Sequence, residues 1–182
     1  KGTLDFIGTG KTEGVFQLES AGMQSFMKEL SPQSFEDIVA GISLYRPGPM
    51  DFIPNYIKGK NNPKEISYVT PELESILEPT YGCIVYQEQV MQLAGYTMGQ
   101  ADNIRRAMSK KKQYVIDAER QSFVYGDEER GIKGCVANGI DEKAANSIYD
   151  SMVDFAKYAF NKSHAAAYAK ISVQTAWLKN YY

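Results

Sequence analysis

Apolar residues in this chain recur three and four positions apart, in short segments that end at a proline or a glycine. This spacing is the sequence feature that most restricts which folds the chain can adopt. Examples are residues 23–30, 35–42 and 144–156. Such spacing is typical of amphipathic helices. Only brief stretches favour extended chain, namely Gly14–Glu19, where apolar and polar residues alternate, and the apolar run Cys83–Tyr86. We therefore predict a mainly α, multi-helix domain with a few short extended segments.

Helix ends are marked by residues that cap or block a helix. Ser20 and Asp141 each precede a helical pattern, and Ser34 with Asp37 has the spacing of a capping box. The turn Tyr45–Pro49 must stop the second helix, because a proline disfavours helix at the residue before it. That turn places Arg46 at a helix end.

Polar and glycine-rich stretches indicate where the chain would subdivide. We expect one region over residues 1–182, with subdivision points near 60–70 and at 126–138, a charged segment that we expect to be exposed. The chain begins without methionine and ends inside an expected helix. We therefore expect it to be a piece of a larger protein.

Composition excludes several kinds of site. The net charge is −2, so any site for a polyanion must be local. The single histidine excludes a multi-histidine metal site, and Cys83 and Cys135 fit no metal-binding spacing. Free thiols are typical of a cytoplasmic protein, which we expect here. No apolar run is long enough to span a bilayer.

A basic cluster stands out against this acidic background. Five cationic residues lie within eight positions without a carboxylate among them: Arg105, Arg106, Lys110, Lys111 and Lys112. Ile104, Ala107 and Met108 repeat at helical spacing beside them, and Asp102 is the expected N-cap.

Two interpretations of the basic cluster remain open. Arg106 and Lys110 are four residues apart and so repel each other on one helix face. A nucleic acid or a nucleoside triphosphate would relieve that repulsion, whereas the alternative is a solvated basic face.

His164 and Tyr168 form a second candidate site. They are also four residues apart, and Ser163 is the expected cap of their helix, which alanines favour. An imidazole and a phenol on one face make a platform on which bases stack. The alternative is a structural, hydrogen-bonding histidine.

Catalytic patterns are weak. Glu19 and Glu88 lack a second carboxylate at a defined spacing, and Asp5 has no acidic partner for two-metal chemistry. The segment Gly8–Thr12 contains a lysine and a threonine but not the spacing of a phosphate-binding loop.

Seven ordered motifs resemble the fingers region of the bacterial DNA polymerase III alpha subunit, a C-family replicative polymerase. Together they are specific, although each alone would be weak. They are GVFQLES (14–20), YRPGP (45–49), LEPTYG (77–82), VYQEQVM (85–91), RRAMSKKK (105–112), FNKSHAAAY (160–168) and QTAWLK (174–179).

The resemblance implies roles for residues. Arg105 and Arg106 would face the triphosphate of the incoming deoxynucleotide, with Lys110 and Lys111 supporting their charge. His164 and Tyr168 would face the nascent base pair, and Arg46 would lie at the same cleft.

The resemblance also implies contacts with DNA and with other parts of the enzyme. Lys112 and Lys162 would contact DNA. The template-primer, the palm and thumb domains and, through other regions, the sliding clamp would be partners.

In that family a palm domain upstream of these motifs supplies the aspartates for two-metal nucleotidyl transfer. We therefore expect Mg²⁺ in the full polymerase but no cofactor and no activity in this fragment. The alternatives are a stand-alone nucleic-acid-binding helical module and a helical protein-interaction domain.

Overall fold

The protein is described by a computed structural model that covers residues 1–109, 113–156 and 162–182. Side chains are described throughout except at residues 87, 102, 105–109, 113 and 154–156. In these ranges the secondary structure is helical, and Asp127 and Ile132 form an isolated antiparallel bridge. The prediction of a mainly α fold is confirmed. No helix in these ranges has both the length and the apolar character needed to cross a bilayer.

The chain divides into two compact units, Lys1–Ile57 with Phe160–Tyr182, and Lys58–Ala159. The division falls within α4 (Ile53–Asn61). The first unit contains α1 (Gly2–Ile7), α2 (Ala21–Leu30), α3 (Phe35–Leu44), the short 3₁₀ helix η1 (Pro49–Phe52) and α10 (Lys162–Tyr181). The second contains α5 (Glu74–Leu77), α6 (Gln87–Met91), α7 (Met98–Ser109), α8 (Gln113–Tyr125), α9 (Glu142–Ala156) and the 3₁₀ helices η2 (Pro63–Glu65), η3 (Pro71–Leu73), η4 (Glu78–Thr80), η5 (Gln92–Ala94) and η6 (Val136–Asn138).

The caps predicted for α2 and α3 are confirmed. The Ser20 hydroxyl accepts a hydrogen bond from the Met23 N–H at 3.3 Å. Ser34 and Asp37 form the capping box, in which Ser34 Oγ accepts from the Asp37 N–H at 3.1 Å and the Asp37 carboxylate accepts from the Ser34 N–H. These side chains satisfy N–H groups that have no partner inside the helix. The predicted stripe of α2 is buried, as Met23, Phe26, Met27 and Leu30.

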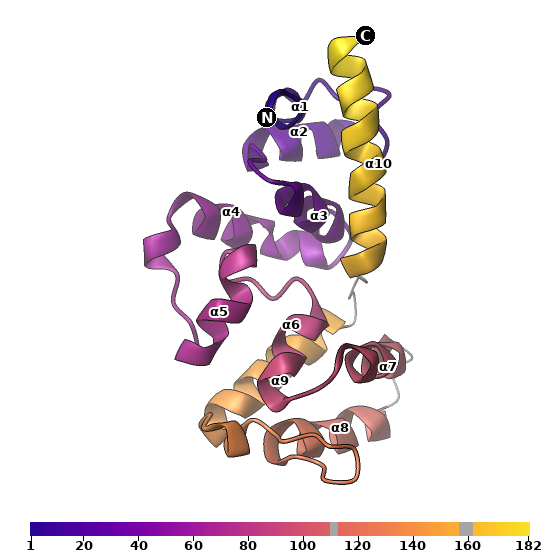
Figure 1. The fold of residues 1–182 in the computed structure, drawn as a ribbon. Coiled ribbons are helices and arrows are strands. Elements are labelled where there is room, and N and C mark those ends of the chain that lie inside the picture. Colours follow the sequence, from indigo (N-terminus) through magenta and orange to yellow (C-terminus); the bar gives the residue numbers. More distant parts are fainter. Residues whose placement is uncertain (110–112, 157–161) are drawn as a thin grey trace. The chain divides into compact units, whose positions relative to one another are not determined.

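α10 packs on α3 through small side chains. Its buried residues are Ala165, Ala169, Ser172 and Ala176, spaced four, three and four apart. Small residues on one helix face let a neighbouring backbone approach closely. Figure 1 shows α10, at the yellow end of the colour scale, running alongside α1 and α3 from the indigo end. The first unit is thus built from two segments that are distant in the sequence.

The segment Gly14–Glu19 is a pair of tight turns and not the predicted strand. The Val15 N–H donates to the Thr12 carbonyl at 3.1 Å, and the Leu18 N–H donates to the Val15 carbonyl at 3.0 Å. Val15 and Leu18 are fully buried and are three residues apart. The apolar residues therefore reach the core through successive turns, which alternation in the sequence cannot distinguish from a strand.

The second unit has a core formed mainly by α6 to α9, which includes Phe123, Ile148, Tyr149 and Met152. The Asp141 side chain caps α9 as predicted, because Oδ2 accepts from the N–H groups of Lys143 and Ala144.

A buried glutamine joins two of the sequence motifs within the second unit. Gln89 Oε1 accepts from the N–H groups of Val85, at 3.1 Å, and Tyr86, at 2.9 Å. Its Nε2 donates to Thr80 Oγ1 at 2.9 Å. The segment Cys83–Tyr86 has no helical hydrogen bonds of its own, so Gln89 satisfies backbone groups that would otherwise be buried without partners.

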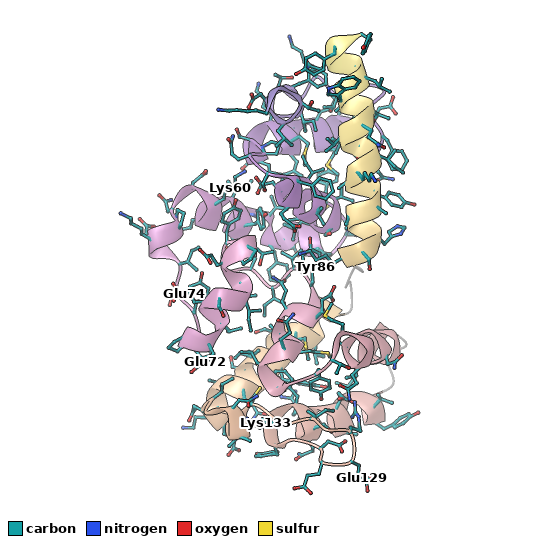
Figure 2. The ribbon with its side chains drawn as sticks, viewed as in Figure 1. Lys60, Glu72, Glu74, Tyr86, Glu129 and Lys133 are labelled. Atoms are coloured by element: carbon teal, nitrogen blue, oxygen red, sulfur yellow. The ribbon has the colours of Figure 1, made fainter. Side chains whose placement is uncertain are left out.

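The segment 126–138 is at least partly exposed at most of its residues, but Ile132, Gly134 and Cys135 are buried. Ile132 and Cys135 are buried, and the Cys135 N–H donates to the Phe123 carbonyl at 2.9 Å. Glu129 lies at the outer tip of the turn, as Figure 2 shows. The charged residues thus occupy the tip, while apolar residues that follow them return to the core.

Candidate nucleic-acid interface

The first turns of α10 carry the predicted aromatic pair. The ring centroids of His164 and Tyr168 are 4.1 Å apart, with an angle of 45° between the planes. His164 is exposed and Tyr168 is half-buried. The contact follows from their spacing, because residues four apart are neighbours on a helix face. Ser163, the expected cap, is instead the second residue of α10.

A third ring extends this pair, and it was not predicted as a site residue. The Phe16 and Tyr168 ring centroids are 5.2 Å apart, with 41° between the planes. The Phe16 N–H also donates to Thr175 Oγ1 at 3.2 Å. The sequence gives no signal for this contact, because the two rings come from segments about 150 residues apart. Phe16 had been interpreted only as part of a short strand.

Lys162, predicted to contact DNA, lies beside a carboxylate. Its ammonium nitrogen is 3.1 Å from Glu36 Oε2, on the first turn of α3. Both side chains are roughly half exposed, 42% for Lys162 and 49% for Glu36. Solvent screens such a pair, so it fixes the lysine only weakly. Lys162 also begins α10, where the first N–H groups add partial positive charge.

Arg46 lies in the turn that follows α3, as the sequence predicted. It is half-buried, its N–H donates to the Leu44 carbonyl at 2.8 Å, and Gly48 permits the turn with φ of +100°. The neighbouring Tyr45 fixes the turn against α2. Its ring stacks on Phe26 with centroids 5.7 Å apart, and its hydroxyl occupies the space that a Cβ at Gly22 would need.

The basic cluster belongs to the second unit. Arg105 and Arg106 lie in the last turns of α7, and their side chains are outside the described residues, as are Lys110, Lys111 and Lys112 altogether. Ile104 is buried, as its place in the predicted stripe requires.

The predicted start of the basic helix is wrong. α7 begins at Met98, one turn before Asp102. Its cap is Thr97, whose Oγ1 accepts from the Gln100 N–H at 3.3 Å, while Gln100 Oε1 accepts from the Thr97 N–H at 2.9 Å. The spacing Thr-x-x-Gln is a capping-box signature that the sequence contained.

A cluster of hydrogen-bonded polar side chains in the second unit, Tyr96, Glu119 and Arg130, has a structural role. Arg130 donates two hydrogen bonds to the buried Glu119 carboxylate, at 3.1 and 3.0 Å, and the Tyr96 hydroxyl donates to the same carboxylate. Burial and this hydrogen bond raise the pKa of Tyr96 far above its ordinary value. Because these groups satisfy one another, they hold α8 to its surroundings and offer no open site.

The described residues of the first unit offer aromatic faces and a cationic side chain near the start of α10. The rings of Phe16 and His164 both contact that of Tyr168, and Lys162 precedes His164 and Tyr168 on α10. Among the described residues, no three His, Cys, Asp or Glu side chains gather closely enough to hold a metal ion. Aromatic faces bind nucleobases without regard to sequence, and a lysine binds phosphate as a point charge.

Comparisons with known proteins give one consistent result. Residues 1–131 match the family model described as the bacterial DNA polymerase III alpha subunit finger domain. The chain is 50% identical to the DNA polymerase III subunit alpha of Halalkalibacterium halodurans and 48% identical to that of Bacillus subtilis, in each case over 99% of this chain and 16% of the relative. It is 45% identical to that of Borreliella burgdorferi, over 99% of this chain and 15% of the relative. The chain thus spans about one sixth of the length of these relatives.

Proposed function

Because this chain belongs to the bacterial DNA polymerase III alpha-subunit family, as its fingers region, we propose that it binds the incoming deoxynucleoside triphosphate and the end of the template-primer. It does so for a palm domain that lies outside this chain and joins the nucleotide to the primer. The chain is then part of a DNA-directed DNA polymerase that acts in DNA replication.

The pair of rings on α10, His164 and Tyr168, supports this proposal most directly. A replicative polymerase must hold a base pair of any sequence, so contacts to base faces suit it better than hydrogen bonds to particular base edges. His164 and Tyr168 provide such faces beside Lys162 and the N-terminus of a long helix. In our proposal they contact the nascent base pair while Lys162 contacts the DNA backbone.

In this proposal the basic cluster binds the phosphates of the incoming nucleotide and of the DNA. Arg105 and Arg106 bind the triphosphate, because a planar guanidinium donates two parallel hydrogen bonds to phosphate oxygens. Lys110 and Lys111 add charge, and Lys112 contacts DNA. Arg46, in its turn after α3, lies at the nucleotide cleft. Such groups position and neutralise the phosphates and do not react themselves.

The remaining partners belong to the complete polymerase. The palm holds Mg²⁺ through its aspartates, the thumb grips the duplex, and the sliding clamp is met through other regions. This chain alone should therefore give only background primer extension with Mg²⁺ and all four deoxynucleotides. Templated extension by the pure 182-residue chain would contradict the division of labour that we propose.

The nucleotide-binding role is tested in a full-length alpha subunit that carries this sequence. Arg106→Ala should raise the apparent Kd for the incoming deoxynucleotide in single-turnover incorporation, by roughly tenfold or more for a charge-assisted contact. The control is Lys143→Ala, which removes an exposed charge from α9 in the same unit.

The outcomes separate the proposed function from its alternatives. If Arg106→Ala raises the Kd for nucleotide and the control does not, the polymerase role is supported. Weaker binding to duplex DNA with an unchanged Kd for nucleotide would indicate a general nucleic-acid-binding module. If neither changes, the basic cluster is a solvated face or meets a protein partner.

A further inference from the structure

The turns that precede α2, residues 12–18, pack into the core and form hydrogen bonds with α10. Thr12 Oγ1 donates to the Leu18 carbonyl at 2.6 Å in a buried hydrogen bond that closes the turns on themselves. Lys179, in the last turn of α10, donates to the Glu13 carbonyl, and its ammonium also lies 3.4 Å from the Glu13 carboxylate. With the bond from the Phe16 N–H to Thr175, these contacts hold the segment along the helix that carries Tyr168.

Phe16 remains at the surface although its neighbours are buried. Val15 and Leu18 are fully buried, whereas the exposed fraction of Phe16 is 37%. The exposed part of the Phe16 ring is therefore open to a partner, and it lies beside the ring of Tyr168. The Phe16 ring packs against the Tyr168 ring, with centroids 5.2 Å apart and the planes tilted by 41°.

Gln17 takes a strained backbone conformation right after Phe16. Its φ is +64°, in the left-handed region that residues with a Cβ rarely adopt. The left-handed residue reverses the chain, so that Leu18 returns to the core while Phe16 stays beside Tyr168. Strain at an exposed residue is maintained only where the surrounding contacts fix it, and it points to function.

We propose that Phe16 is a third member of the base-stacking platform, so that the rings of His164, Tyr168 and Phe16 together contact both bases of the nascent base pair. The proposal rests on the function proposed above. It adds that the turn Gly14–Glu19 belongs to the nucleic-acid interface and that Phe16 contacts the second base of the pair.

A group of rings distinguishes a base pair from a single base. The rings of His164 and Phe16 both contact the Tyr168 ring, with centroids 4.1 Å and 5.2 Å from it and planes tilted by 45° and 41°, so the aromatic surface is larger than one ring. A single base can stack on Tyr168 alone, but a base pair presents a longer face that reaches the neighbouring ring. Phe16 should therefore matter for the nascent base pair and little for unpaired DNA, whereas Tyr168 should matter for both.

The experiment uses a full-length alpha subunit carrying this sequence and a primer-template with 2-aminopurine at the templating position, where it is paired with the bound complementary deoxynucleotide on a primer that lacks a 3′ hydroxyl. Stacking lowers the fluorescence of this base, so the signal reports contact with the platform. Single-turnover incorporation opposite it, on the same primer with its 3′ hydroxyl, measures the consequence. The variant is Phe16→Leu, which keeps an apolar side chain but removes the aromatic face, and Phe16→Tyr restores that face.

The matched control is Phe35→Leu. Phe35 is another exposed phenylalanine of the first unit, with an exposed fraction of 41%, at the start of α3. Both leucine variants should unfold at the same temperature. Should Phe16→Leu fail to fold, Thr175→Val provides a second test, because it removes the acceptor for the Phe16 N–H and leaves all three rings in place.

We expect Phe16→Leu to raise the 2-aminopurine fluorescence and to lower incorporation roughly tenfold, within the range for loss of one stacked base. Phe16→Tyr and Phe35→Leu should behave as the wild type, and Thr175→Val should shift the fluorescence in the same direction by less. If Phe16→Leu, or in its place Thr175→Val, keeps the wild-type signal and rate while Tyr168→Leu is impaired, our inference about Phe16 is wrong and the proposed function stands. If Tyr168→Leu also behaves as the wild type, both are overturned.

Discussion

The Lys162 ammonium lies 3.1 Å from the Glu36 carboxylate, so a lysine proposed to contact DNA is paired with an acidic residue of α3. In the proposed contact, the Glu36 carboxylate and a DNA phosphate would compete for the Lys162 ammonium. A carboxylate beside a phosphate contact also repels the phosphate. If Lys162 contacts DNA as we propose, Glu36 weakens that contact.

Removing the Glu36 charge should strengthen DNA binding. Glu36→Gln removes a carboxylate from beside Lys162 and should raise affinity for a primer-template a few-fold, whereas Lys162→Gln should lower both the affinity and the dependence on salt, by roughly 0.9 in log–log slope per lost contact. Stability should change by less than about 1 kcal/mol in each variant, because the pair is exposed. Fluorescence anisotropy over a range of salt concentrations measures the slope. The control is Glu29→Gln, an exposed carboxylate of α2; if Glu36→Gln binds no better than this control, Lys162 makes no phosphate contact.

Truncating Tyr168 should cost less stability than truncating a core ring. Tyr168 is half-buried and loses mainly its contacts with Phe16 and His164, so Tyr168→Ala should destabilise by about 1–2 kcal/mol. Phe26→Ala, in the core of the same unit, should cost about 3–5 kcal/mol. Thermal unfolding of both variants gives the comparison. An equal fall in midpoint would assign Tyr168 to the core and remove its functional interpretation.

The two cysteines should be unpaired and slow to react. Both are free thiols, and burial raises the pKa of Cys83 to about 11 and that of Cys135 to about 12. The thiolate is the reactive form, so at pH 8 only about one thiol in a thousand at Cys83 is reactive. Titration with a thiol reagent should be slow in the folded protein and rapid for both cysteines after denaturation. A disulfide in freshly prepared protein would contradict this.

The same pKa shift predicts a loss of stability at alkaline pH. In the unfolded chain a thiol deprotonates near pH 9, whereas folded Cys135 holds its proton to about pH 12. The contribution of Cys135 is therefore fully present below pH 9 and is lost as the pH rises toward 12, by about 1.4 kcal/mol per pH unit. Urea unfolding at pH 8 and pH 10 should show a smaller loss in Cys135→Ala than in the wild type. Equal losses would mean that other groups, such as buried tyrosines, account for the pH dependence.

Gln89 should be essential for stability although it is polar. Gln89→Leu leaves the buried N–H groups of Val85 and Tyr86 without their acceptor, at a cost of about 1–3 kcal/mol for each. Gln92→Leu, an exposed change three residues away, should stay within about 0.5 kcal/mol. Urea unfolding distinguishes the two. Similar stabilities would show that water can replace the Gln89 amide.

Local features of the fold were predictable from the sequence. Ser20, Ser34 and Asp141 were identified as caps because the groups they bond lie two or three residues away. The inward stripe of α2 followed from spacing alone. Thr97 and Gln100 could have been identified in the same way, and placing the cap at Asp102 overlooked their capping box.

Features that depend on distant residues were not predictable. Phe16 contacts Tyr168 because α10 packs along α3, and neither segment carries a signal for the other. The segment 126–138 was expected to be exposed because it is charged, yet Ile132 and Cys135 are buried in the core of the second unit. Lys162 illustrates the same limit, because the carboxylate beside its ammonium, that of Glu36, belongs to a different helix.

The discontinuity of the first unit has a consequence for how the protein is made. Phe16 and Thr175 are 159 residues apart in the sequence, and the second unit, a continuous stretch of about a hundred residues, lies between the segments that they join. During translation the N-terminal segment leaves the ribosome long before α10 is synthesised. Until then, the surface of α3 that packs against Ala165 and Ala169 stays exposed. The second unit has all its partners sooner and can fold first. High contact order should therefore make α10 docking the slow step, and ribosome-bound chains that stop before residue 160 should remain sensitive to protease in α1 to α3.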